Sequence, residues 1–328
     1  MAQHTSPASV PERDTNNLRN WWRALRNVRS EQRGETWAAL FFVGPPLLLY
    51  VVFNAYPVAR GIMLAFTDER YLVPGYAPFV GLGNWVELAH DHVFWESLSR
   101  SLGYFAIFLV LDFIIAFIVA LLITEIRSGR EASMYRAIVY LPVVLPIAVA
   151  VLVWKQILNG QFGYVDVFLK GTLHLQQTPD FIRDPHWTIP VLALIAVWKA
   201  AGSNMMLFLV GLYSINTELY EAASLDGAGW WTRLFRITLP LMRPSFTLIF
   251  VLGAGALGVV EETLVFFQIP DAGPENAGRT IGRYAYETAF LQGDLRWGYA
   301  AAINLTVAFI SIAISAFIFR VLRSERVV

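Results

Sequence analysis

The sequence contains no cysteine, little lysine and few charges for its length. Without cysteine, the 328-residue chain forms no disulfide, zinc–thiolate site or thiol nucleophile. Its only lysines, Lys155, Lys170 and Lys199, follow Trp or Leu, so the chain has no Gly-Lys pair. A P-loop needs Gly-Lys followed by Ser or Thr to cradle phosphates, which excludes ATP hydrolysis through that device.

Other chemical signatures are missing as well. No Gly-x-Ser-x-Gly nucleophile elbow occurs, and a formal net charge of +0 gives no reason to expect nucleic acid as a partner. The histidines lie in the N-terminal tail or in connecting segments, where a solvated surface explains them better than a metal site. They are His4, His90, His92, His174 and His186. We therefore predict no catalytic residue, no metal and no cofactor in this chain.

Apolar residues dominate what is present. They make up 56% of the chain, against 15% charged residues, a composition typical of a polytopic membrane protein. A transmembrane helix needs about 20 apolar residues. Six segments qualify: Trp37–Pro57, Ser101–Thr124, Ala137–Leu158, Trp187–Tyr213, Pro240–Phe267 and Gly298–Val321. We predict an all-α membrane protein with six transmembrane helices.

Polar residues and prolines mark several of these segments. We expect the polar run 199–204 to interrupt the fourth span, and the third span to tolerate Pro142 and Pro146. Ionisable and polar groups at membrane depth are costly, so they are candidates for a translocation path. The candidates are Lys199, Asn204, Glu261, Glu262, Asn304 and Thr306. For Asp112 we favour a structural role, and for the others helix–helix hydrogen bonding or a Lys199–Glu262 pair is an equal alternative.

The two ends of the chain differ from the spans. Residues 1–16 are polar and typical of a disordered tail, whereas 17–34 place tryptophan and leucine on one face and arginine on the other. Such a helix suits the surface of a membrane with anionic lipid. We divide the chain into a tail at 1–36, a six-span membrane domain at 37–323 and a short tail at 324–328.

Arginine in the connecting segments sets the expected orientation. It is concentrated in the N-terminal tail, between the second and third spans, in the segment 217–240 and at the C-terminus. By the positive-inside rule, both termini and the segment 217–240 are cytoplasmic. The longer connections at about 58–100, 159–186 and 268–297 then face the outside.

The segment 217–240, which we call the elbow, separates two apolar spans. Thr217–Leu225 predicts a short helix with Asn216 or Thr217 as its cap, and the glycines at 227 and 229 predict a turn into a second helix. Pro240 is expected to begin the next span, where a missing N–H is tolerated.

The elbow resembles the EAA loop of permease subunits of bacterial ABC importers. That pattern is Glu-Ala-Ala, three residues, Gly, nine residues, Ile, one residue, Leu-Pro. The matching positions are Glu221, Ala222, Ala223, Gly227, Ile237, Leu239 and Pro240. The resemblance implies that these residues, with Asp226, couple the permease to a separate ATPase that binds ATP and magnesium.

Further motifs are similar to those of the carbohydrate-uptake class, of the maltose or sn-glycerol-3-phosphate type, and of its first permease subunit. They are Phe79–Trp85, Leu141-Pro142 with Val153-Trp154-Lys155, and Gly298–Ala302. Two positions depart from the family pattern: Asn216 replaces a proline, and Ala272 replaces a glycine before Gly273-Pro274.

The resemblance also implies partners. They are a second similar permease, two ATPase subunits, an extracytoplasmic solute-binding protein received by the outer connections, and membrane lipid. The site of action is the bacterial inner membrane. Neutral oligosaccharides, polyols, sugar phosphates and uronate oligomers all remain open as substrates. An ion- or proton-coupled secondary transporter and a scaffold remain alternatives, although the internal repeats common in such carriers are missing.

Overall fold

The computed structural model describes residues 33–73, 75, 77–175, 177–258, 266 and 272–322. Contacts divide the chain into two units, Met1–Arg60 and Gly61–Val328. The amphipathic helix predicted at 17–34 lies almost wholly outside the described residues.

The described part of the first unit is helical, and its last helix ends at Leu64. It comprises α2 (Arg33–Tyr50), the π-helical turn η1 (Val51–Ala55) and α3 (Tyr56–Leu64). The predicted end of this span at Pro57 is wrong. Proline removes one helical hydrogen bond and crowds the preceding turn, and here that turn widens so that Tyr56 N–H donates to Val51 O. The helix therefore continues past Pro57.

Two long helices lie side by side at the centre of the second unit. They are α5 (His92–Thr124) and α9 (Pro185–Tyr213), and α16 (Trp297–Leu322) is the third long helix of this unit. Together with Phe41–Leu64, these are the described helices long and apolar enough to cross a membrane singly. Asp91 begins α5 ahead of the predicted Ser101, because its carboxylate accepts from the N–H groups of Val93 and Phe94.

Two further predicted spans are bent pairs of helices. The first is α6 (Gly129–Val144) with α7 (Ile147–Ile157), which meet at 99°. The expectation of one helix through Pro146 is wrong: this proline holds Leu145 in an extended conformation, which ends α6. Pro142, in contrast, lies inside α6. Counting each bent pair as one span gives the six predicted spans.

The second bent pair joins the elbow to the fifth span. The helical stretch Trp230–Leu241 comprises α11 (Trp230–Arg233), the π-helical turn η2 (Leu234–Thr238) and α12 (Leu239–Leu241). It meets α13 (Arg243–Gly253) and the 3-10 turn η3 (Ala254–Gly258) at 61°. The bend therefore lies at Met242, and the prediction that Pro240 begins a new helix is wrong. The predicted end at Phe267 lies outside the described residues.

The expected interruption of the fourth span is also wrong. α9 is continuous through the polar run 199–204. Its polar side chains have partners within or beside the helix: Ser203 Oγ donates to Ala200 O at 2.7 Å, and Asn204 donates to Asp112. Satisfied polar groups leave the backbone hydrogen bonds of a helix intact.

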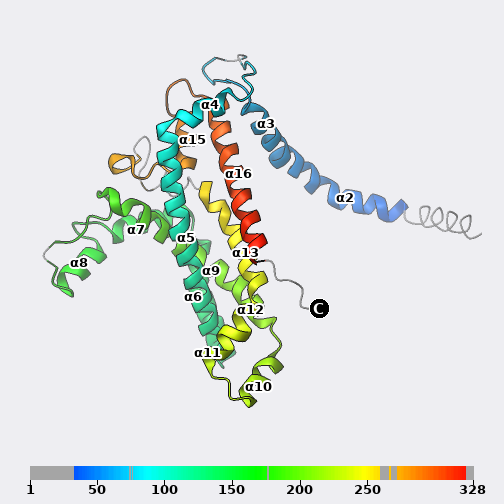
Figure 1. Cartoon of the computed structure of the whole chain (residues 1–328), viewed down its shortest axis with the longest axis vertical. Helices are drawn as coiled ribbons and strands as arrows, with labels where there is room; N and C mark the ends of the chain where they lie inside the picture. Colours follow the sequence, from blue (N-terminus) through cyan, green and yellow to red (C-terminus); the bar gives the residue numbers. More distant parts are fainter. Residues whose placement is uncertain are drawn as a thin grey trace, which may run out of the picture. The chain divides into compact units, whose positions relative to one another are not determined.

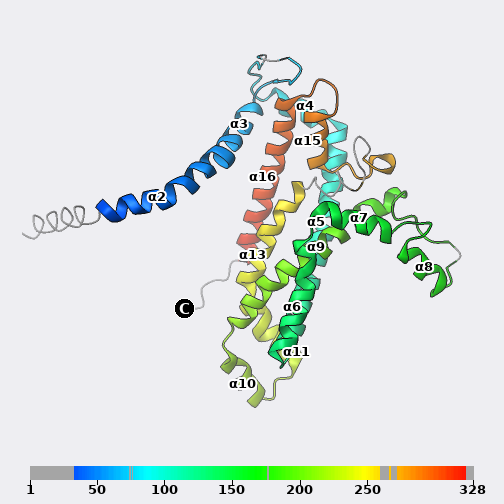
Figure 2. The ribbon, with the colours of Figure 1, turned by 180° about the vertical axis from the view of Figure 1, so that it is seen from behind.

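Short helices occupy the longer connections between the spans. They are α4 (Gly83–His90), α8 (Tyr164–Gly171), the 3-10 turn η4 (Pro274–Asn276) and α15 (Ile281–Phe290). Both views show α4 and α15 at one end of the second unit and α10 (Thr217–Leu225) and α11 at the other (Figures 1 and 2). The described residues form no strand, only isolated bridges at Thr67–Phe79 and Arg70–Arg296. The all-α fold class is confirmed.

Candidate coupling site and polar path

The first limb of the elbow is α10, a helix with a defined start and end. Asn216 Oδ1 accepts from Glu218 N–H at 3.0 Å and caps the start. At the end, Gly227 has φ +77°, Ala228 N–H donates to Ala223 O at 2.8 Å, and Gly227 N–H donates to Ser224 O at 3.1 Å. This pair of bonds is a Schellman cap, which requires a left-handed residue and so favours glycine. The helix predicted at 217–225 is confirmed.

The second limb contains a π-helical turn directly before Pro240. Leu239 N–H donates to Leu234 O, one residue further back than in an α-helix. Since Pro240 lacks an N–H, the wider turn lets the limb pass through it without breaking. Both π turns of the described chain precede a proline in this way, at Pro57 and Pro240.

Side-chain hydrogen bonds clasp the two limbs together. The hydroxyls of Tyr220 and Thr238 are 2.9 Å apart and share a hydrogen bond. Arg233 Nη1 donates to Ser224 Oγ at 3.2 Å, and Ser224 Oγ donates in turn to Tyr220 O at 2.6 Å. The limbs therefore move together rather than separately.

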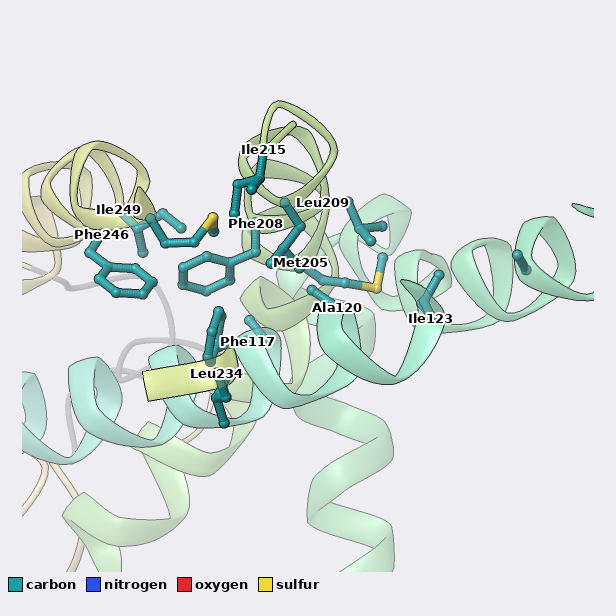
Figure 3. Packing of buried hydrophobic residues seen from close by; sticks show 14 residues of the cluster. Phe117, Ala120, Ile123, Met205, Phe208, Leu209, Ile215, Leu234, Phe246 and Ile249 are labelled. Atoms are coloured by element: carbon teal, nitrogen blue, oxygen red, sulfur yellow. The ribbon is translucent and has the colours of Figure 1, made fainter. Parts of the chain in front are cut away.

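The elbow is also anchored in the largest described hydrophobic cluster. Leu234 from the elbow packs with Phe117 of α5, Phe208 of α9 and Phe246 of α13 (Figure 3). The three phenylalanine rings lie 5.2–5.9 Å apart between centroids, in edge-to-face arrangements. The other buried members are Ala116, Ala120, Ile123, Ala132, Met205, Leu209, Leu212, Ile215, Met242 and Ile249.

The remaining face of the elbow is exposed and partly apolar. Leu225 is 90% exposed, and the rings of Trp231 and Phe235 stack on the surface with centroids 6.0 Å apart. Among the residues singled out from the sequence, Glu221, Ala222, Asp226, Gly227 and Pro240 are exposed, and Ala223, Ile237 and Leu239 are partly buried. The structure thus gathers the predicted residues on one short, anchored segment.

The polar residues of the spans form separate pairs. Asn204 donates to Asp112 Oδ2 at 2.6 Å between α9 and α5, and Asp112 is 2% exposed. The other oxygen of this carboxylate has no partner among the described residues. Lys199 Nζ donates to Val143 O at 3.4 Å. The pairing of Lys199 with Glu262 stays untested, because Glu261 and Glu262 lie outside the described residues.

Two candidates on α16 differ from each other. Thr306 Oγ1 accepts from Trp85 Nε1 at 3.1 Å and donates to Ala302 O at 2.8 Å, so it joins α16 to α4. Asn304 is exposed. Among the described residues, no recorded contact joins these positions to the Asp112–Asn204 pair, so the candidates do not form one cluster within the chain.

The motif Phe79–Trp85 holds together the end of the second unit at which α4 lies. Asn84 is 2% exposed and donates to Ala65 O at 2.8 Å and Thr67 O at 2.9 Å. Trp85 packs on Phe66, with centroids 4.9 Å apart, and reaches Thr306. This motif therefore attaches the segment after the first span to the last span.

Asp91 joins three helices at the same end. Besides capping α5, it accepts from Tyr284 of α15 at 2.5 Å and Tyr299 of α16 at 2.6 Å. Burial by itself raises the pKa of Asp91, but the hydrogen bonds from both tyrosines and from two backbone N–H groups lower it below its usual range. Burial, followed by the bond to Asp91, raises the pKa of Tyr284.

Ion pairs surround this junction. Arg296 pairs with Glu87 of α4 at 2.5 Å and with Asp68 at 3.7 Å, and Arg70 pairs with Asp294 at 2.5 Å. The hydrogen bond to Glu87 raises the pKa of Arg296 above its usual value, although burial opposes this shift. The charges therefore fix the connection before α16 against the connection after α3.

A buried charge cluster lies within α15 and its flanks. Glu287 accepts from Arg283 and Arg279, each at 2.8 Å, and from Gln292 at 3.1 Å. The side chain of Arg283 is 0% exposed and that of Glu287 is 1% exposed. Removing one partner of such a buried pair leaves an uncompensated charge, so α15 is held in one arrangement.

Comparison with known proteins decides the family. Residues 113–327 match the model of the family described as the binding-protein-dependent transport system inner membrane component. This chain belongs to that family. It is a transmembrane permease subunit of an ABC importer.

Relatives extend over most of the permease. The diacetylchitobiose uptake system permease of Streptomyces coelicolor is 32% identical over 87% of this chain and 82% of its own. The sulfoquinovosyl glycerol transport system permease of Agrobacterium fabrum is 26% identical over 96% of this chain and 100% of its own.

A solved structure shares the permease fold. The crystal structure of a bacterial ABC transporter that imports the acidic polysaccharide alginate contains a chain with TM-score 0.75 and 24% identity. The match covers 92% of this permease and 98% of that chain.

Several residues of the permease were not anticipated from its sequence. Asp91 meets Tyr284 and Tyr299 from distant parts of the chain, whereas Arg283 and Glu287 pair four positions apart on α15. Asp91 carries one local signal, since an aspartate directly before an apolar helix is a typical cap. The spacing of Arg283 and Glu287 is a second, since residues four apart are neighbours on a helix. The contacts of Asp91 with the two tyrosines depend on how the helices pack, which local sequence does not encode.

Proposed function

We propose that this permease carries a carbohydrate across the bacterial inner membrane and that its elbow transmits ATPase movement to the spans. The permease would work with a second similar permease, two ATPase subunits that bind ATP and magnesium, and an extracytoplasmic solute-binding protein. Its termini and elbow would be cytoplasmic, as the distribution of arginine indicates.

The carbohydrate assignment is supported by the relatives. Permeases named for diacetylchitobiose, lactose and arabinooligosaccharides are 32%, 26% and 26% identical to this chain. All three names describe neutral sugars, whereas sulfoquinovosyl glycerol, for which a further relative of 26% identity is named, and alginate are acidic. Because the relative with 32% identity is named for a neutral disaccharide, we favour a neutral oligosaccharide of a few sugar units.

The coupling role rests on one observation, the anchoring of the elbow in the core of the spans. Leu234 and Met242 belong to the same buried cluster as residues of α5 and α9. Because packed interiors deform little, a force on the exposed face of the elbow displaces these helices with it. Leu225 and Trp231 supply the apolar surface on which an ATPase subunit would bind.

A pair of glycines tests the coupling role. Gly227 has φ +77°, whereas Gly229 has φ −68°, and a Cβ at either position meets nothing within 4 Å. Gly227→Val strains the cap of α10 by about 1–2 kcal/mol per left-handed residue, and Gly229→Val does not. We expect Gly227→Val to lower ATPase recovery on purification or substrate-stimulated ATP hydrolysis at least severalfold.

Gly229→Val is the matched control and should retain both properties. Equal coupling in the two variants would contradict the proposed role of the elbow. A panel of neutral, phosphorylated and acidic sugars presented with the binding protein tests the substrate class. Stimulation by acidic sugars alone would overturn the neutral assignment.

A further inference from the structure

A cavity of about 380 Å³ lies where the elbow meets the ends of α5 and α9. This volume falls within the range of roughly 300–1,000 Å³ typical of small-molecule sites. Leu121, Leu212 and Leu234 provide apolar walls, and Glu125 and Arg233 provide charges of opposite sign. Leu234, Tyr220 and Thr238, which hold the elbow in place, are part of this lining, but the coupling role assigns no ligand to the space that they enclose.

Arg233 gives the cavity a positive pole. Its Nη1 is bonded to Ser224 at 3.2 Å, and the side chain is partly exposed where it lines the cavity. A guanidinium is stabilised by a charged acceptor, and phosphate oxygens suit it in geometry and charge. An anionic oxygen in the cavity would therefore pair with Arg233.

Glu125 gives the cavity a negative pole. It is the C-cap residue of α5, where the carbonyl groups of a long helix already favour a cation. No recorded ion pair joins Glu125 to another described residue. The rings of Tyr213 and Tyr220 also line the cavity and suit an ammonium group.

The location of the cavity indicates where its ligand comes from. α5 ends at Thr124 and α9 at Tyr213, both in the lining, so the cavity lies where two spans leave the membrane. Trp230 and Tyr213 are residue types enriched at the level of the lipid head groups. A molecule with both charges is therefore close at hand in the bilayer itself.

We propose that this cavity binds the phosphoethanolamine head group of a zwitterionic phospholipid, with its phosphate on Arg233 and its ammonium on Glu125. The head group would bridge the elbow and the end of α5. If the elbow couples as proposed above, this lipid would stiffen the connection and raise coupling efficiency. Binding itself does not depend on that role.

Photolabelling of the assembled importer tests the proposal. The importer is reconstituted in nanodiscs with photoactivatable phosphatidylethanolamine or phosphatidylglycerol, and labelled peptides are mapped by mass spectrometry. We expect phosphatidylethanolamine to label peptides from 121–125 and 230–234 more strongly than phosphatidylglycerol, which lacks the ammonium group. Arg233→Gln and Glu125→Gln should each reduce that labelling about tenfold, the change expected for one charge-assisted hydrogen bond.

Matched controls are Arg236→Gln and Glu131→Gln, exposed charges outside the cavity lining. They should label like the native chain. Equal labelling by the two lipids, or equal loss in the controls, would overturn the proposal. Competition by soluble phosphoethanolamine at micromolar concentration would also overturn it, in favour of a free metabolite.

The test separates this inference from the coupling role. Labelling requires no ATP hydrolysis, so it reports on the cavity even if the Gly227 and Gly229 variants couple equally. Co-elution of each variant with its partner subunits confirms that the fold is intact. Loss of selective labelling while Gly227→Val still uncouples transport would remove the lipid site alone.

Discussion

Tyr284 and Tyr286 offer a direct comparison at the junction around Asp91. The hydroxyl of Tyr284 donates to Asp91 at 2.5 Å, whereas Tyr286 contacts Phe290 through its ring. We expect Tyr284→Phe to lower the unfolding free energy by about 1–2 kcal/mol, because Asp91 loses a hydrogen bond to a charged group. Tyr286→Phe should have little effect. Thermal denaturation in detergent measures both, and equal changes would contradict the assignment.

The pKa of Asp91 also predicts a dependence on pH. Since the folded-state pKa lies below the unfolded value of about 3.9, the ionised carboxylate stabilises the fold above about pH 4. This contribution is lost as the pH falls through the folded-state pKa. The stability difference between the native chain and Asp91→Asn should stay constant from about pH 5 to 8 and shrink below about pH 4. A difference that shrinks near pH 6 would contradict the account.

Asp112 and Asn204 form the one recorded hydrogen bond between side chains of α5 and α9 among the described residues. A double-mutant cycle with Asp112→Leu and Asn204→Leu should give a coupling energy of about 1 kcal/mol, as for other bonds between membrane helices. Asp112→Leu with Asn304→Leu is the control and should be additive, because no recorded contact links them. A coupling energy near zero for the first pair would contradict a stabilising hydrogen bond between Asp112 and Asn204.

At the scale of elements, the backbones of α6 and α9 approach each other closely at Gly202. A Cβ at this position would lie 2.5 Å from Val139 O and 2.8 Å from Tyr140 Cα, both of them backbone atoms. Gly202→Ala should therefore separate the helices and destabilise the protein by about 1–3 kcal/mol. Gly103→Ala in α5, where a Cβ meets nothing within 4 Å, should be neutral or stabilising. The reverse order of stabilities would contradict the packing.

Sequence patterns predicted the elements best where the deciding interactions are local. α10 has its cap at Asn216 and its Schellman glycine at Gly227 within one short stretch, and its bounds were predicted correctly. The ends of the helices were harder to predict, because a proline can end a helix, lie inside it or be accommodated by a π turn. Pro57 and Pro240 are absorbed by π turns, Pro142 lies within α6, and Pro146 ends it.

Polarity was likewise an unreliable sign of a break. Lys199 and Asn204 suggested an interrupted span, yet α9 is continuous because Asn204 finds Asp112 on the neighbouring helix. That partner lies 92 positions away in the chain. Long-range pairs such as this one, and the junction around Asp91, require the packed structure and not the periodicity of one segment.

At the scale of the whole molecule, hydrogen bonds and ion pairs fix the end of the second unit that holds α4 and α15, and a hydrophobic cluster fixes the elbow at the other end. The first end is tied by Asn84, Asp91 and Arg296, and the elbow by Leu234. The proposed coupling role needs an elbow that is anchored in this way and partly apolar on its exposed face.

Transport by the reconstituted importer tests this account most directly. The permease, purified with its co-expressed partners, is placed in liposomes with the binding protein and a labelled neutral oligosaccharide on the outer side. We predict uptake that requires ATP on the elbow side and that falls at least severalfold with Gly227→Val but not with Gly229→Val. Uptake by the permease alone, without ATP and driven by a proton gradient, would contradict the account and identify a secondary transporter.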